Sequence, residues 1–101
     1  MDSLKSMAKM EDEVNVIASI YTYKTHIIIH NLNENFITNN LMYIHRVDEA
    51  LSALDGNLQE LIKNDFFFHQ TPNWWKHLYP CHYYLKLRYK AVSHFLMHFY
   101  D

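Results

Sequence analysis

The chain has very little glycine, proline or cysteine. Its 101 residues include one glycine, two prolines and one cysteine. This scarcity excludes collagen-like chains and flexible linkers, disfavours turn-rich β-sandwiches, and leaves too few glycines for a phosphate-binding loop. Because Cys81 has no second cysteine to pair with, an internal disulfide is excluded and a reducing compartment is favoured. We therefore expect an intracellular, cytoplasmic protein.

Long hydrophobic runs and a strong net charge are missing as well. No uncharged run approaches the roughly 18 residues that a membrane-spanning helix needs, and the charged N-terminus lacks the apolar stretch of a signal peptide. The formal net charge is −2 at pH 7, which indicates neither a polybasic membrane anchor nor a nucleic-acid coat protein. We expect no association with membranes.

The chain is instead rich in hydrophobic and aromatic residues. Half of its residues are hydrophobic and 20% are charged, which is typical of a globular domain, and the length suits a single domain over residues 1–101. Ten of the eleven acidic residues lie within residues 1–65, whereas twelve of the sixteen aromatic residues lie within 66–101. The bias toward Asn, Ile, Lys, Tyr and Phe is typical of AT-rich coding, as in low-GC bacteria and their phages.

Apolar residues recur at intervals of three and four, the period of an α-helix. This spacing predicts helices near residues 3–34, 39–67 and 80–100, with a short helix or turn at 71–79. Gly56 lies in phase within the second helix, where we interpret it as a helical glycine that costs about 1 kcal/mol relative to alanine. Two apolar seams are predicted: Ile44, Val47, Leu51, Leu54, Leu58 and Leu61 in the second helix, and Leu85, Tyr89, Val92, Leu96 and Phe99 in the last.

Three amphipathic helices predict an all-α fold, an antiparallel three-helix bundle. Thr38 or Asn39 is expected to cap the second helix, because their side chains accept hydrogen bonds from the first turn. Pro80 is expected to begin the last helix, because the residue before a proline avoids the α-helical region. The helices are long for a chain of this size, so we expect the bundle to form a homodimer.

Histidines form two pairs with helical spacing. His26 and His30 are four residues apart, as are His94 and His98, so each pair would share one face of a helix. With Glu34 beside the first pair, two such helices side by side could hold a metal ion. The simpler interpretation is that these imidazoles are solvated or satisfy hydrogen bonds. We favour the simpler interpretation and expect no metal or other cofactor.

Five residues separate Arg88 from His94 on the last predicted helix, in the stretch Arg-Tyr-Lys-Ala-Val-Ser-His. This stretch resembles the motif of HEPN-type ribonucleases, although Tyr89 stands where that family usually carries a polar residue. The resemblance implies RNA cleavage, in which Arg88 would stabilise the scissile phosphate and His94 would assist proton transfer across a homodimer. This is the enzymatic alternative to the binding function favoured below.

Arg88 also has a purely structural interpretation. On a helical wheel it falls within the apolar arc of the last helix, where an unpaired guanidinium is too costly to bury. The apolar seam of the second helix leads next to Asp65. We therefore predict a buried ion pair between Arg88 and Asp65, or failing that between Arg88 and Asp48.

Six large rings and a lysine surround the turn expected near residues 71–79. Some of the rings must cover the core, but a domain of this size has too little interior for all of them, and exposed aromatic residues are the usual anchors of protein interfaces. We predict a regulator or inhibitor that binds a protein partner through its basic, aromatic C-terminal third. Nucleic acid is the less favoured partner, because the basic residues form no tight patch. The predicted binding residues are Phe66, Phe67, Phe68, Trp74, Trp75, Lys76 and Tyr79.

Overall fold

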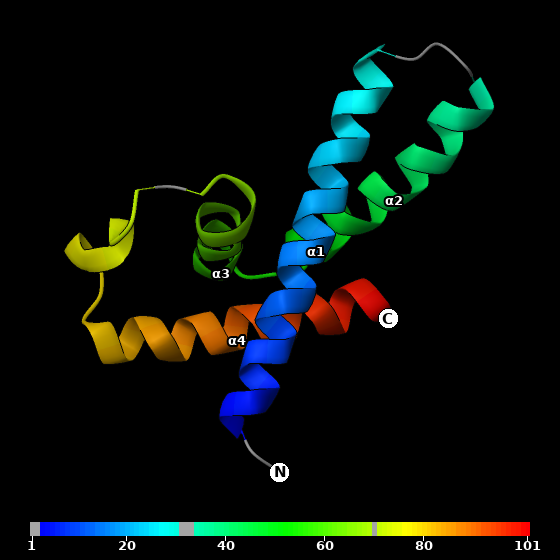
Figure 1. Ribbon diagram of the computed structural model, residues 1–101. Coiled ribbons are helices and arrows are strands. Elements are labelled where there is room, and N and C mark those ends of the chain that lie inside the picture. The colour runs from blue at the N-terminus through cyan, green and yellow to red at the C-terminus, as the bar shows by residue number, and fades with distance from the viewer. Residues whose placement is uncertain (1–2, 31–33, 70) are drawn as a thin grey trace.

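The computed structural model describes residues 3–30, 34–69 and 71–101, and every regular element within them is helical (Figure 1). The α-class predicted from the sequence is therefore confirmed. The elements are α1 (Ser3–His30), α2 (Glu34–Ser52), α3 (Gly56–Ile62), a π-helical turn η1 (Lys63–Phe67), a 3-10 turn η2 (Trp74–His77) and α4 (Cys81–Tyr100).

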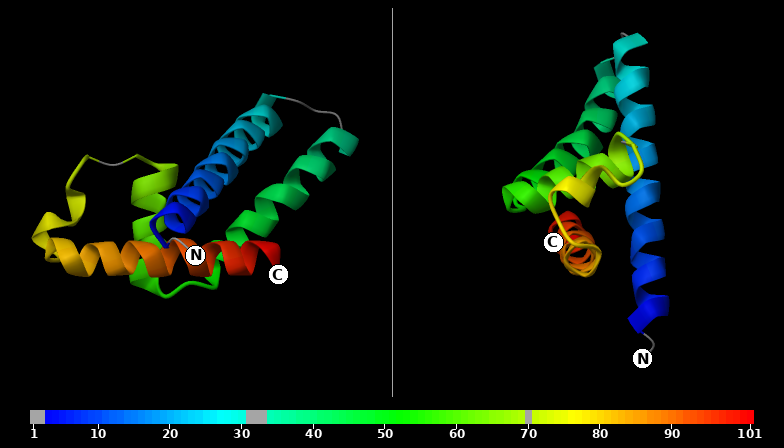
Figure 2. Two further views of the ribbon diagram at one scale, coloured as in Figure 1. Left: turned by 60° about the horizontal axis from the view of Figure 1, so that its bottom comes forward. Right: turned by 90° about the vertical axis from the view of Figure 1, so that its left-hand side faces the viewer.

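The helices α1 and α2 form an antiparallel hairpin, and α4 crosses this hairpin instead of lying alongside it (Figures 1 and 2). This crossing differs from the side-by-side bundle expected from the sequence. The described chain measures 47 × 32 × 21 Å, with a radius of gyration of 14.9 Å, above the roughly 13 Å of a compact chain of similar length. The molecule is elongated because the 28 residues of α1 extend beyond the crossing at both ends.

The core lies where α1, α2, α3 and α4 meet. Val14, Val47 and Phe95 from three different helices are completely buried. The predicted seam of the second helix is buried from Val47 onward, but the first two residues of the last seam are not: Leu85 is 56% exposed and Tyr89 is 51% exposed. The first half of α4 thus presents part of its apolar seam to solvent.

The single helix predicted over residues 39–67 is wrong. The helix α2 ends at Ser52, Asp55 is extended (φ −58°, ψ 151°) at the N-cap position, and α3 begins at Gly56. Gly56 therefore opens a helix and does not lie within one. The Asp55 side chain forms no capping hydrogen bond, but its carbonyl accepts the first bond of α3, from the Gln59 backbone N–H at 2.9 Å. The apolar seam stays buried on both sides of the break, so the spacing alone did not reveal it.

The predicted start of the second helix is also wrong, because Thr38 and Asn39 lie inside α2, which begins at Glu34. No glycine or proline in this stretch stops the helix from beginning earlier. The side chain of Asn40 is buried and accepts a hydrogen bond from Lys24 Nζ at 2.8 Å. This contact ties α2 to α1 directly after the expected cap positions.

The π-helical turn η1 follows α3 without interruption. Its wide turn is closed by the Phe68 backbone N–H, which donates to the Lys63 carbonyl at 2.7 Å, five residues back. A π-turn adds a residue to the helical repeat and so rotates the side chains that follow it. Within this turn, the ring of Phe66 lies in the core and Asp65 reaches α4.

Replacing Gly56 with alanine tests its position at the start of α3. An added Cβ would meet no atom within 4 Å, and the residue does not have a positive φ. We expect Gly56→Ala to raise the free energy of unfolding by about 0.4–1 kcal/mol, because alanine restricts the unfolded chain. Urea denaturation of the two proteins measures this change, and a destabilised variant would contradict the observed geometry at Gly56.

Candidate functional site around Arg88

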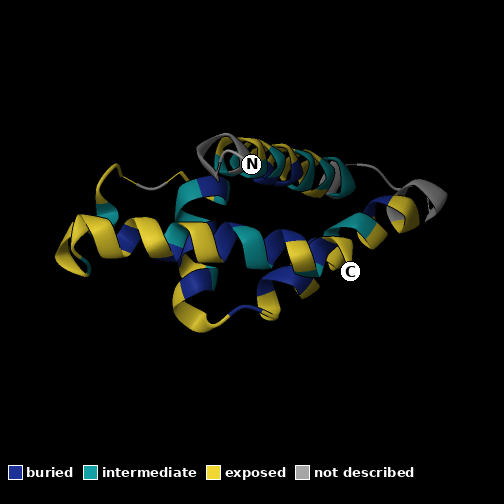
Figure 3. Cartoon of the chain, turned by 90° about the horizontal axis from the view of Figure 1, so that it is seen from below, coloured by how far each residue is buried: buried dark blue, intermediate teal, exposed yellow. Residues whose placement is uncertain are grey.

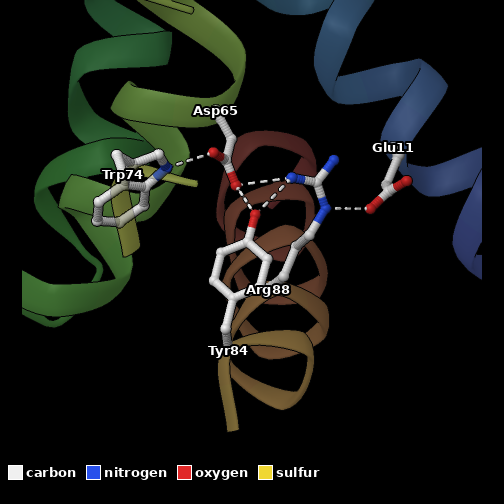
Figure 4. Close-up of polar contacts among 5 residues, drawn as sticks. All are labelled: Glu11, Asp65, Trp74, Tyr84 and Arg88. Carbon is white, nitrogen blue, oxygen red and sulfur yellow. Dashed lines mark hydrogen bonds and ion pairs between the residues drawn. The ribbon is translucent and has the colours of Figure 1, made fainter. Parts of the chain in front are cut away.

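Arg88 joins α4 to two other elements (Figure 4). Its Nε donates to Glu11 Oε2 on α1 at 2.5 Å, and its Nη1 donates to Asp65 Oδ2 on η1 at 2.6 Å. Nη1 also donates to the hydroxyl oxygen of Tyr84 at 3.0 Å, one turn earlier on α4. One partly buried guanidinium thus links α1, η1 and α4 through charge-assisted hydrogen bonds, which are the stronger kind.

Asp65 makes three hydrogen bonds in this cluster, as many as Arg88. It accepts hydrogen bonds from the Tyr84 hydroxyl, from Arg88 and from Trp74 Nε1, the last at 2.6 Å. Its side chain is only 11% exposed, and these donors offset the cost of removing a carboxylate from water. The structure therefore contains the Arg88–Asp65 contact that the sequence suggested, while Asp48 accepts a hydrogen bond from α1 instead.

Aromatic rings enclose the cluster. The Arg88 guanidinium carbon lies 4.7 Å from the centre of the Phe66 ring, within cation–π range. Trp75 stacks on Tyr84 with ring centres 4.3 Å apart and planes 9° apart, and Trp74 meets the same ring edge-on at 6.4 Å. Both tryptophans thus pack against α4 and help to hold the connector that precedes it.

The surroundings shift the pKa values of two groups in the cluster. Burial, followed by the hydrogen bond to Asp65, raises the pKa of Tyr84 to about 12. Burial alone would lower the pKa of Arg88, but hydrogen bonds to Glu11 and Tyr84 raise it above its ordinary value. At neutral pH the phenol is therefore protonated and the guanidinium is charged, which suits a structural clamp and not a proton-transfer site.

The geometry gives no support to the ribonuclease alternative. The guanidinium of Arg88 already contacts two carboxylates, which a substrate phosphate would have to displace. His94 lies six positions further along α4, which rotates its side chain by about 240° from Arg88. Among the described residues, no hydrogen bond or ion pair joins His94 to the cluster.

The histidine pairs do not face one another. The C-terminal end of α1, which contains His26 and His30, lies away from α4 in both ribbon figures (Figures 1 and 2). The side chains of His30 and Glu34 lie outside the described part of the structure, while His94 and His98 are half-buried on α4. No group of three or more His, Cys, Asp or Glu residues is placed to hold a metal within the described residues.

The predicted binding residues occupy three different environments. Phe66 is in the core with 2% exposure, so its assignment to a binding surface is wrong. Phe67, Trp74, Trp75 and Tyr79 are half-buried and pack against the core, because a chain of this size uses its large rings to complete the fold. The two exposed members of the predicted set are Phe68 and Lys76.

Other exposed apolar residues were missed by the sequence reasoning. Leu78 follows η2 and is exposed, and so is Tyr83, whose ring lies 5.5 Å from that of Tyr79. Leu85 and Tyr89 were assigned to a buried seam. The signal that could have identified them is the unbroken series of lysines and histidines beside them on α4, because such a series indicates a solvated face.

Comparison of the chain with family models, curated proteins and solved structures gives no match. The likeness to HEPN ribonucleases therefore rests on the seven residues from Arg88 to His94. Within the part of the chain that the structure describes, no helix is both long and apolar enough to cross a membrane. The function of the chain must therefore be inferred from its own residues.

Removal of the Asp65 charge is expected to destabilise the fold. Asp65→Asn leaves Arg88 with a single carboxylate partner, so we expect the free energy of unfolding to fall by roughly 2–3 kcal/mol. Glu11→Gln is the matched control, because Glu11 is more exposed and makes one contact; its loss should be below about 1 kcal/mol. Urea denaturation measures the free energy of unfolding of both variants. Equal losses of this free energy would show that Asp65 is not the main partner of Arg88.

Alkaline pH is expected to weaken the fold through Tyr84. Its pKa is raised from 10.0 to about 12 in the folded state, so the unfolded chain loses this proton first. The stabilisation is complete below pH 10 and is lost as the pH rises through 12. In Tyr84→Phe, unfolding measured between pH 9 and 12 should show a smaller decline, although Tyr21, with a similar pKa, still contributes.

The exposed Tyr83 is the control for this pH series. Its hydroxyl forms no hydrogen bond in the described structure, so Tyr83→Phe should follow the wild-type decline. A decline in Tyr84→Phe as steep as that of the wild type would show that Tyr84 does not stabilise the fold in its protonated form.

Proposed function

We propose that the chain is a protein-interaction module, a regulator or inhibitor that binds a protein partner through its C-terminal third. The observation that supports this most is the apolar surface that the fold leaves uncovered after η2. Leu78 is 60% exposed and Tyr83 is 45% exposed, and Leu85 and Tyr89 follow on the next turns of α4. Exposed apolar residues gathered in one segment are typical of an interaction site, whereas single ones are not.

The charge of this segment supports the same proposal. Lys76, Lys86 and Lys90 are exposed, and residues 66–100 contain no aspartate or glutamate. The charge of Arg88, by contrast, is already balanced by Glu11 and Asp65. The uncovered surface therefore combines apolar side chains with positive charge, a combination that favours a partner with apolar and acidic residues.

Partner capture tests the proposed function. The wild-type protein, immobilised, should retain a specific protein from an extract of the cells that encode it. Leu78→Ser with Tyr83→Ser should reduce that capture about tenfold, the effect of losing roughly 1.4 kcal/mol of apolar contact. Val16→Ser with Tyr23→Ser removes a similar exposed pair from α1 and should leave the capture unchanged.

Circular dichroism of each variant checks that the helices persist. Failure of the wild type to retain any protein, or equal losses in the two double variants, would contradict the proposal. The homodimer expected from the sequence stays a prediction, and sedimentation of the same purified proteins measures it.

A further inference from the structure

The first half of α4 has two short rows of exposed residues, each spaced by four positions. Side chains four residues apart are neighbours on a helix surface, and each such step turns about 40° around the axis, so the two rows share an outward face over roughly 14 Å of helix. The basic row is His82, Lys86 and Lys90. The apolar row is Cys81, Leu85 and Tyr89.

The fold leaves both short rows open to solvent. Leu85 and Tyr89 are each more than half exposed, and Lys86 and Lys90 are exposed and form no ion pair in the described structure. Figure 3 shows exposed residues over the first half of α4, and Figure 2 shows α2 and α3 on one side of α4 and α1 running past it along another. Among the described residues, therefore, nothing gives this face an apolar cover or a counter-charge.

From these two rows we infer the chemistry of the partner: the outward face of α4 binds an acidic amphipathic helix. An inference of this kind rests on the proposed function, because it names the class of partner. Rows with four-residue spacing form the ridges that pack into the grooves of a second helix. A helix with its own apolar row would cover Leu85 and Tyr89, and acidic residues beside that row would meet Lys86 and Lys90.

Two other occupants fit this face less well. A nucleic acid would meet only two lysines as fixed charges and would place phosphates against Leu85 and Tyr89, where they gain nothing. A second copy of the chain, related by a two-fold axis along this face, would bring Lys86 and Lys90 close to their own equivalents, and like charges opposed across an interface are unfavourable.

Fluorescence anisotropy with synthetic probes tests the inference. The first probe is a labelled 18-residue helical peptide, which is about 27 Å long and therefore spans both rows. It has leucines spaced by four positions and glutamates in the adjacent row. The second has lysines in place of the glutamates, and the third is a single-stranded RNA. We expect the full-length protein to bind the acidic peptide, with an affinity that falls as salt is added, and to bind the other two far more weakly.

Two pairs of matched variants locate the binding. Leu85 and Val16 are both 56% exposed, but Val16 lies on α1. We expect Leu85→Ser to weaken peptide binding about tenfold and Val16→Ser to leave it unchanged. Lys90→Glu and Lys9→Glu make the same change of charge at exposed sites. Lys90→Glu should weaken binding about fivefold, and Lys9→Glu by less than twofold.

Three results with the probes would overturn the inference: stronger binding of the RNA than of the acidic peptide, equal effects of Lys90→Glu and Lys9→Glu, or an unchanged affinity in Leu85→Ser. A fourth, capture that depends on Leu78 and Tyr83 but not on Leu85, would overturn it while the proposed function stands. Peptide binding with the expected variant pattern, but without any captured protein, would instead support this surface and contradict the proposed function.

Discussion

The charge of Arg88 constrains how the rest of the chain can pack. The residue lies on the side of α4 that faces the core, so its guanidinium needs counter-charges within the protein. Glu11 and Asp65 supply them from α1 and η1. Because both contacts are short and come from elements far apart in the sequence, α4 satisfies them in one position along its axis, and a shift by one turn would leave a charge unpaired.

The same cluster explains why some of the large rings pack within the fold while others stay exposed. Asp65 needs further hydrogen-bond donors, and Trp74 and Tyr84 provide them. Trp75 then stacks on Tyr84, so the aromatic residues nearest to the connector complete the structure. The exposed rings include Phe68 beside the connector and, on α4, Tyr83 and Tyr89.

Helical periodicity was sufficient to predict the all-α class and the approximate positions of α1 and α4. It also identified Asp65 as a partner for Arg88. Asp65 follows Leu61 by four residues, so it continues the apolar seam and must face the same side of the helix as that seam. The break at Asp55 could not be predicted in this way, since the seam continues in phase across it. Nor does a helical wheel show whether a second element covers Leu85 and Tyr89, because that depends on the angle at which helices cross.

The hydrogen bond between Trp74 and Asp65 has a consequence for recognition. Together with the stacking of Trp75, it fixes the connector directly before α4, so the exposed side chains of Leu78 and Tyr83 are held in position before any encounter. A partner that binds there would lose little conformational entropy in ordering this segment, and association would be limited mainly by diffusion and orientation. A chain with a loose connector and the same exposed residues would bind more weakly, although the list of contacts in the complex would be identical.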